Sequence, residues 1–168
     1  GLPTPTAQAL LAWVDTGGHL LLRVSPPYRD ENAVQGPLLD ALGVDSAYYE
    51  AACKPFHVAD DPGHSEFCRG LRFAVDPPAG IRVEREWGDE DGLVFARLNK
   101  GSGRISVLSD MEFLKGTPRV FDPDQPRDSL ADGLHDLAHR DLARYLLEPN
   151  YTKGTFWLVY GSRPPTLW

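Results

Sequence analysis

The chain has 168 residues, 42% hydrophobic and 24% charged, values typical of one globular domain with a core of its own. It carries 17 basic and 24 acidic residues, a formal net charge of −7, and no run of Lys or Arg forms a stripe along the sequence. Nucleic-acid binding is therefore not expected, because it requires basic side chains that neutralise phosphates. No apolar run approaches the ~20 residues that a membrane-crossing helix needs.

The beginning of the chain predicts a helix that leads directly into a buried strand. Ala7–Val14 has helical apolar spacing, Thr16–Gly18 is expected to end the helix, and His19–Val24 is typical of a buried strand. Gly17 suits the left-handed conformation of a helix cap. Because a helix followed so closely by a strand is the second half of a βα repeat, we expect the first strand of that repeat upstream of Gly1.

The middle of the chain predicts a short helix, an irregular excursion and two strands. Pro37–Leu42 has Pro in its first turn and is followed by a glycine, as expected for a helix. Asp45–Gly70 lacks periodicity and is rich in turn-forming residues, so we expect no regular structure there. Leu71–Val75 and Ile81–Glu86 alternate apolar and polar residues and are expected to be strands.

A β-hairpin and a long helix are predicted next. Leu93–Leu98 and Arg104–Leu108 are the strands of the hairpin, and the two glycines of Lys100–Gly103 are expected to supply positive φ angles in its turn. A short helix is expected around Met111–Lys115. Leu130–Leu147 is the longest predicted helix. Its apolar face, at 3.6-residue spacing, consists of Leu130, Leu134, Leu137, Ala138, Leu142, Tyr145 and Leu146. Thr155–Tyr160 is expected to be a closing buried strand.

These elements predict an α/β fold, with a mixed and partly parallel sheet flanked by helices and an antiparallel hairpin. We expect residues 1–168 to be a single domain, excised from a larger protein.

Three segments in this order resemble a known family. They are Leu10–Leu21 (LLAWVDTGGHLL), Gly101–Asp110 (GSGRISVLSD) and Asp141–Leu147 (DLARYLL), completed by Phe156–Tyr160 and Pro164–Leu167. The combination is similar to the domain-of-unknown-function family 4350, bacterial membrane-protein domains related in fold to class I glutamine amidotransferases.

The resemblance implies an amidotransferase-like or flavodoxin-like sheet that lacks its first βα unit. It also implies membrane helices on either side of the domain, outside this chain, and a location at the cell membrane, facing the periplasm or the cell exterior. Other membrane proteins, linked to a MoxR-type ATPase system, are the implied partners.

The function expected from these features is non-catalytic binding or interaction outside the cytoplasm. Neither cysteine lies on the glycine-flanked turn that a glutaminase nucleophile requires, so no catalytic residue, cofactor or metal is assigned.

The alternative is a hydrolase with a site near Asp110 and Asp141. Asp110 closes a predicted strand, where ligands bind in open α/β sheets. Asp141 falls within the predicted apolar face and is expected to be buried and hydrogen-bonded. The expected ligand-binding residues are Asp110, Glu112, His139, Arg140 and Asp141.

Two further patterns contain possible metal ligands. Cys53, His57, His64 and Cys68 form a symmetric C-x3-H-x6-H-x3-C arrangement of zinc-ligand types, although a disulfide between the cysteines is favoured, with free thiols as the other alternative. His135 and His139 lie one helical turn apart, as in metal-dependent proteases, but Asp136 stands where those enzymes have Glu. We expect both histidines to be half-exposed residues at the flank of the apolar face.

Overall fold

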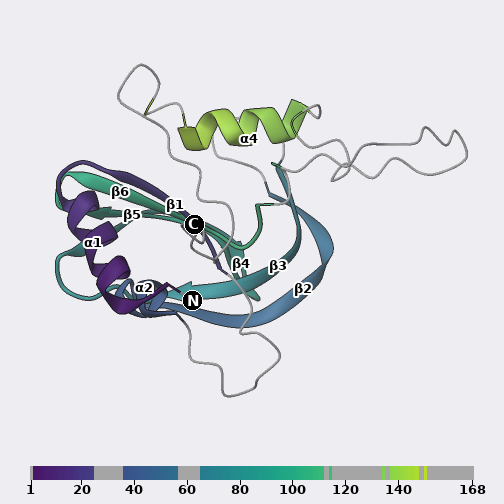
Figure 1. The fold of residues 1–168 in the computed structure, drawn as a ribbon. Helices are drawn as coiled ribbons and strands as arrows, with labels where there is room; N and C mark the ends of the chain where they lie inside the picture. The colour runs from purple at the N-terminus through teal and green to yellow at the C-terminus, as the bar shows by residue number, and fades with distance from the viewer. Residues whose placement is uncertain are drawn as a thin grey trace, which may run out of the picture.

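The computed structural model shows a curled mixed sheet with helices on both faces (Figure 1). It describes residues 2–24, 36–56, 65–111 and 137–147, together with Leu114, Leu134 and Asn150, and describes the backbone alone at 47–56, 65–70 and 137–138. The elements in chain order are α1 (Thr4–Asp15), β1 (His19–Arg23), α2 (Pro37–Ala41), β2 (Val44–Phe56), β3 (Ser65–Val75), β4 (Ile81–Asp89), β5 (Gly92–Lys100), β6 (Gly103–Leu108) and α4 (Leu137–Leu147). The predicted α/β class is confirmed.

The sheet combines one parallel pair of strands with antiparallel pairs. Its strand order is β1-β6-β5-β3-β2, and β4 also pairs with β5. Strands β1 and β6 run parallel, whereas β5–β6, β4–β5, β3–β5 and β2–β3 are antiparallel. This arrangement confirms the partly parallel sheet and places the predicted hairpin, β5–β6, at its centre.

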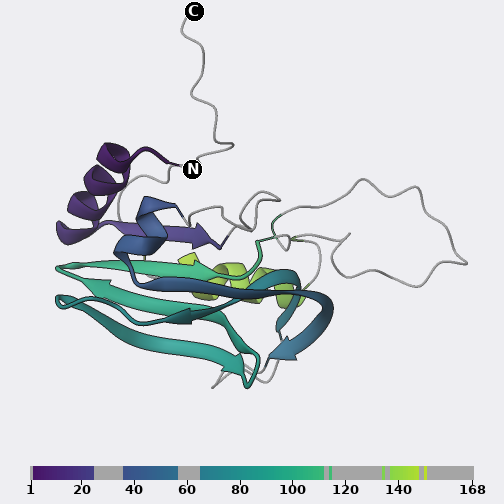
Figure 2. The same cartoon turned by 90° about the horizontal axis from the view of Figure 1, so that it is seen from below.

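Two apolar clusters lie on the two faces of the sheet. Helices α1 and α2 pack on one face, where Val14 and Leu42 join residues of β3, β5 and β6. Helix α4 covers the other face, where Leu142 and Leu146 pack against Trp87, Phe95 and Leu108. In Figure 2, seen from below, α2 lies in front of the sheet and α4 behind it. The sheet therefore separates two cores, and among the described helices it is α4 that closes the second.

The turn from α1 into β1 forms as the sequence predicts. Gly17 has φ of 109°, and its N–H donates to the Val14 carbonyl while the Thr16 hydroxyl donates to the Trp13 carbonyl.

The hairpin turn differs in part from the prediction. Gly101 has a positive φ of 56°, but Gly103 has an ordinary φ and is required for a different reason. A Cβ at Gly103 would lie 1.9 Å from the Val14 carbonyl oxygen, so the glycine lets the end of α1 approach the sheet.

The prediction of an irregular excursion over Asp45–Gly70 is wrong. Strand β2 and the first part of β3 cover most of it, in an antiparallel pair that runs from Val44↔Val75 to Phe56↔Ser65. The pairing has register shifts between Ser46 and Tyr49 and between Glu50 and Cys53. Each such irregularity changes the face to which the following side chains point, so a strand that contains two of them shows no simple alternation in sequence.

The last predicted helix is shorter in the described part of the chain. Helix α4 begins at Leu137, and Leu134 occupies a 3₁₀ position and is 44% exposed. Of the short helix expected around Met111–Lys115, Leu114 occupies a 3₁₀ position and three neighbours are not described. The predicted strand Thr155–Tyr160 lies outside the described residues.

Candidate functional site

The residues predicted as a ligand site do not all face the same way. Asp110 follows β6, at the carboxyl end of the parallel β1–β6 pair, and is 3% exposed. His139 is 2% exposed on the inner face of α4, so the expectation of a half-exposed histidine is wrong. Arg140 and Asp141 are exposed. Glu112 lies outside the described residues, as does His135.

The prediction that Asp141 is buried is wrong because the apolar face of α4 is centred elsewhere. The buried positions are His139, Leu142, Ala143 and Leu146, spaced i, i+3, i+4 and i+7. At about 100° per residue, Asp141 lies roughly on the opposite side of the helix from the centre of that face. The predicted face included Leu134 and Tyr145, which share the angular position of Asp141, but Leu134 is exposed and precedes the helix.

A different set of polar residues gathers on the sheet face that α4 covers. Two neighbouring rows cross β4, β5, β6 and β1 in register. The first row consists of Arg82, Asn99, Arg104 and His19, and the second consists of Arg85, Arg97, Ser106 and Leu21. The next residue of β5 points the other way, since Lys100 pairs with Asp15 of α1. We call His19 and the four arginines of these rows the arginine face.

His19 links β1 to β6 and to Asn150, three residues beyond the end of α4. Its Nδ1 lies 2.5 Å from Asn150 Oδ1, and its Nε2 lies 3.0 Å from Ser106 Oγ. Because an amide oxygen only accepts, Nδ1–H donates to Asn150 and Nε2 accepts from the Ser106 hydroxyl. Burial lowers the pKa of His19; the hydrogen bond to Asn150 opposes this shift, and the charges of Arg104 and Arg97 add to it. The ring is therefore neutral at neutral pH.

Arg97 lies at the centre of the arginine face and is 6% exposed. Its guanidinium carbon is 4.5 Å from the centroid of the Tyr145 ring and 5.5 Å from that of Phe95. Its Nε and Nη2 are buried and have no hydrogen-bond partner among the residues that the structure describes. Burial lowers the pKa of Arg97, although the group remains charged because its ordinary pKa lies far above neutrality. A buried cation with two unused donors is the most unusual feature of this face.

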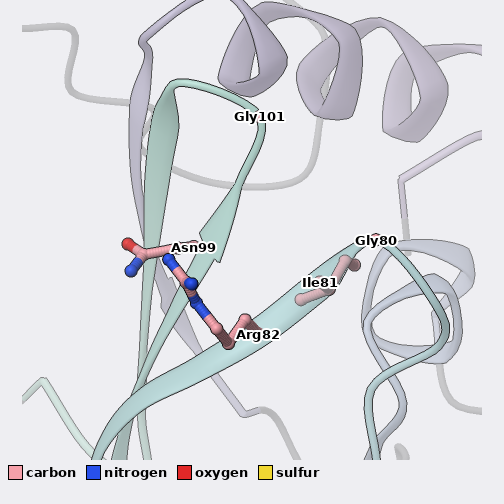
Figure 3. A pocket seen from close by; sticks show the side chains of 5 residues that line it. All are labelled: Gly80, Ile81, Arg82, Asn99 and Gly101. Carbon is pink, nitrogen blue, oxygen red and sulfur yellow. The ribbon is translucent and has the colours of Figure 1, made fainter.

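The other members of the arginine face lie closer to solvent. Arg104 pairs with Glu84 at 3.6 Å, with both side chains about one-third exposed. Arg82 reaches from β4 toward Asn99 of β5, beside a hollow of about 280 Å³ that Gly80, Ile81 and Gly101 complete (Figure 3). The hollow lies at the turn end of the hairpin, where the first row of the face meets the surface.

The arrangement can donate hydrogen bonds and attract negative charge. Ser106, His19 and Asn150 stand in the order of a nucleophile, a base and its orienting group. However, Ser106 is 0% exposed and lies in the middle of β6, so a substrate carbonyl cannot reach its hydroxyl in this conformation. The described geometry therefore favours recognition of an anion over attack by Ser106.

The linear sequence contains only a weak signal for this site. The arginines are scattered over β4, β5 and β6, and only the strand register brings them together. One local sign is Arg97 itself, a charged residue that follows the apolar run Leu93–Ala96 and shares a strand face with Phe95. A charged residue on the inner face of a predicted central strand needs a partner, and that reasoning could have singled out Arg97.

The two cysteines lie directly opposite each other, as predicted. Cys53 pairs with Cys68 in the β2–β3 register, and opposed Cα atoms of antiparallel strands are about 4.5–5.5 Å apart, within the range of a disulfide. The strands continue to Phe56 and Ser65, about 10 Å further along. All four ligands of a zinc ion lie about 2 Å from it. The extended strands between the cysteines and the ends at Phe56 and Ser65 therefore favour a disulfide over the four-residue zinc site.

The structure contains no metal-ligand cluster within residues 2–24, 36–56, 65–111 and 137–147. His57 and His64 lie outside these ranges. None of the described helices is both long enough and apolar enough to cross a bilayer.

Comparison with known proteins shows likeness in fold alone. No family model matches the chain, and no curated protein matches it significantly. Among solved structures, Gan42B, a GH42 β-galactosidase from G. stearothermophilus, aligns with 88% of this chain at 16% identity and a TM-score of 0.50. The exo-β-1,4-mannosidase Op5Man5 from Opitutaceae bacterium strain TAV5 aligns with 88% at 17% identity and a TM-score of 0.43. The chain spans about a fifth of the length of both, covering 20% of Gan42B and 22% of Op5Man5.

Proposed function

We propose that this chain is a non-catalytic binding domain of a bacterial membrane protein and that it recognises a negatively charged group. The observation that carries the proposal is the buried, incompletely hydrogen-bonded guanidinium of Arg97 within the arginine face. A domain with a net charge of −7 that places four arginines on one side of one sheet concentrates positive potential there.

The competing function is hydrolysis, and the described residues support it less well. Asp110 and Asp141 were its predicted carboxylates, but Asp141 points away from the sheet. The relay of Ser106, His19 and Asn150 has suitable hydrogen bonds, yet its hydroxyl is buried. In our proposal these hydrogen bonds have a structural role, because they hold Asn150, beyond the end of α4, to β1 and β6.

We also propose that the domain faces the periplasm or the cell exterior. The resemblance to family 4350 supports this location, and so does the opposition of Cys53 and Cys68, because disulfides persist in oxidising compartments. Membrane proteins linked to a MoxR-type ATPase system remain the proposed partners, on the resemblance alone.

An activity assay with a matched variant tests the binding proposal. Purified protein and its Ser106→Ala variant are incubated with p-nitrophenyl acetate and, separately, with glutamine. We expect neither protein to release product faster than it forms in buffer without protein. Turnover by the wild-type chain that Ser106→Ala abolishes would replace the binding proposal with a serine hydrolase.

Intact-mass analysis tests the location. The protein, expressed with an export signal and without one and trapped with iodoacetamide, is weighed. We expect the exported chain to remain unlabelled and about 2 Da lighter than its reduced form, as a Cys53–Cys68 disulfide requires. Two alkylated cysteines in the exported chain would remove this support for the location.

A further inference from the structure

We infer that the arginine face holds a compact oxyanion, a phosphate or carboxylate group, against the side edge of the Arg97 guanidinium. This inference rests on the proposed binding function and names the ligand class of that site.

The first argument is which atoms of Arg97 are unused. Within the part of the chain that the structure describes, Nε and Nη2 of Arg97 are buried and have no hydrogen-bond partner, and together they form the side edge of the guanidinium. That edge presents two parallel N–H bonds, the spacing that two oxygens of a carboxylate or phosphate accept as a bidentate pair. The unused atoms thus define a specific acceptor shape.

The second argument is that aromatic rings hold the guanidinium in place. Tyr145 lies 4.5 Å from its carbon and Phe95 lies 5.5 Å away. Trp87 packs on both rings, with centroids 4.2 Å from Phe95 and 5.1 Å from Tyr145. A fixed guanidinium loses little conformational entropy when it binds, so its free edge is preorganised for an anion.

The third argument is the charge around Arg97. Arg104 and Arg85 act on Arg97 electrostatically, and Arg104 and Arg97 both act on His19. Glu84 is the opposing acid in this group, and it pairs with Arg104. The mutual repulsion of these cations is relieved when a negative group lies among them.

The fourth argument limits the size of the ligand. Arg97 is 6% exposed and its Nε and Nη2 are buried, so an anion reaches this edge only when the side chains over it move aside, which favours a small terminal group. A nucleic acid would face the remaining charge of a chain whose net charge is −7, which opposes an extended polyanion. The hollow beside Arg82 and Asn99, about 280 Å³, lies in the next row and could receive the part of a ligand that carries the group.

The test measures anion binding with inorganic phosphate and with acetate as separate probes. Each is titrated to 50 mM at constant ionic strength with chloride, and the Nε–H signal of Arg97 is followed by ¹H–¹⁵N NMR. Arg97→Lys, which keeps the charge and removes the edge, identifies that signal by its loss. Lys100→Gln is the matched control, since it removes one positive charge from the same strand on the opposite face.

We expect a saturable shift of the Arg97 Nε–H signal with at least one probe, and the probe that saturates first distinguishes a phosphate from a carboxylate ligand. The dissociation constant measured from the remaining amide signals should rise at least tenfold in Arg97→Lys and less than twofold in Lys100→Gln. A linear, unsaturated response, or equal binding by Arg97→Lys, would overturn the inference. Either result, with no Ser106-dependent turnover, would leave the non-catalytic part of the proposed function standing but not anion recognition through Arg97.

Discussion

The Arg97 guanidinium and the Tyr145 ring lie 4.5 Å apart, and this contact joins the middle strand of the sheet to the last turn of α4. Tyr145 is only half-buried, at the side of the helix rather than on its buried face. Its ring nevertheless completes a group with Trp87 and Phe95. The docking of α4 therefore depends on one cationic residue as well as on its leucines.

Replacing Tyr145 should separate these contributions. Tyr145→Leu removes the ring and should lower the free energy of unfolding by about 2 kcal/mol, from the lost cation–π and aromatic contacts. Tyr145→Phe keeps the ring and should cost well under 1 kcal/mol. Urea denaturation of the two variants makes the comparison, and equal losses would show that the hydroxyl, not the ring, carries the contact.

The opposition of Cys53 and Cys68 predicts a stability that depends on redox state. A disulfide that closes a loop of this length stabilises a domain by about 3 kcal/mol. The urea midpoint of the oxidised protein should fall on addition of dithiothreitol, whereas that of Cys53→Ser should not change. A midpoint insensitive to reductant, with stoichiometric zinc by elemental analysis, would favour the metal site instead.

The pH dependence of stability should report the burial of His19. Its pKa is lowered in the folded state, so between that value and about 6.5 the unfolded chain binds more protons than the folded chain. Stability should therefore rise as pH increases through this interval and level off above it. His19→Asn should flatten the slope in urea titrations between pH 5 and 7.5, and an unchanged slope would assign it to other groups.

The corrected register of α4 makes a direct comparison possible. Asp141 is exposed, so Asp141→Leu should change the free energy of unfolding by less than about 0.5 kcal/mol. Leu142 lies on the buried face of α4, and Leu142→Ala should cost about 2–5 kcal/mol. A larger loss for Asp141→Leu than for Leu142→Ala would restore the register predicted from sequence.

Much of the fold follows from local sequence because its signals are local. The helix–Gly17–strand turn and the β5–β6 hairpin each depend on neighbouring residues, and both form where predicted. Strand β2 and the first part of β3 were missed because bulges in their pairing interrupt the alternation on which strand prediction depends, whereas Leu71–Val75 of β3 was predicted. Asp141 was misplaced because one residue outside the helix, Leu134, was included in the apolar face.

The candidate site depends on distant residues and could not be assembled from sequence. His19 meets Ser106 across 87 positions and Asn150 across 131. Arg97 lies beside Arg85 only through a register that contains a shift between Val83 and Arg85. No spacing along the chain encodes these contacts. Basic residues form no stripe along the sequence, but the strand register gathers four arginines on one face of the sheet.

The most direct test of an oxyanion on the arginine face is a crystal structure of the protein grown with tungstate, a heavy analogue of phosphate. We predict an anomalous difference peak within about 4 Å of the Arg97 guanidinium, the reach of a bidentate pair. The peak should be absent from crystals of Arg97→Lys grown in the same way. Tungstate bound only at other arginines, or equally in both proteins, would contradict the account.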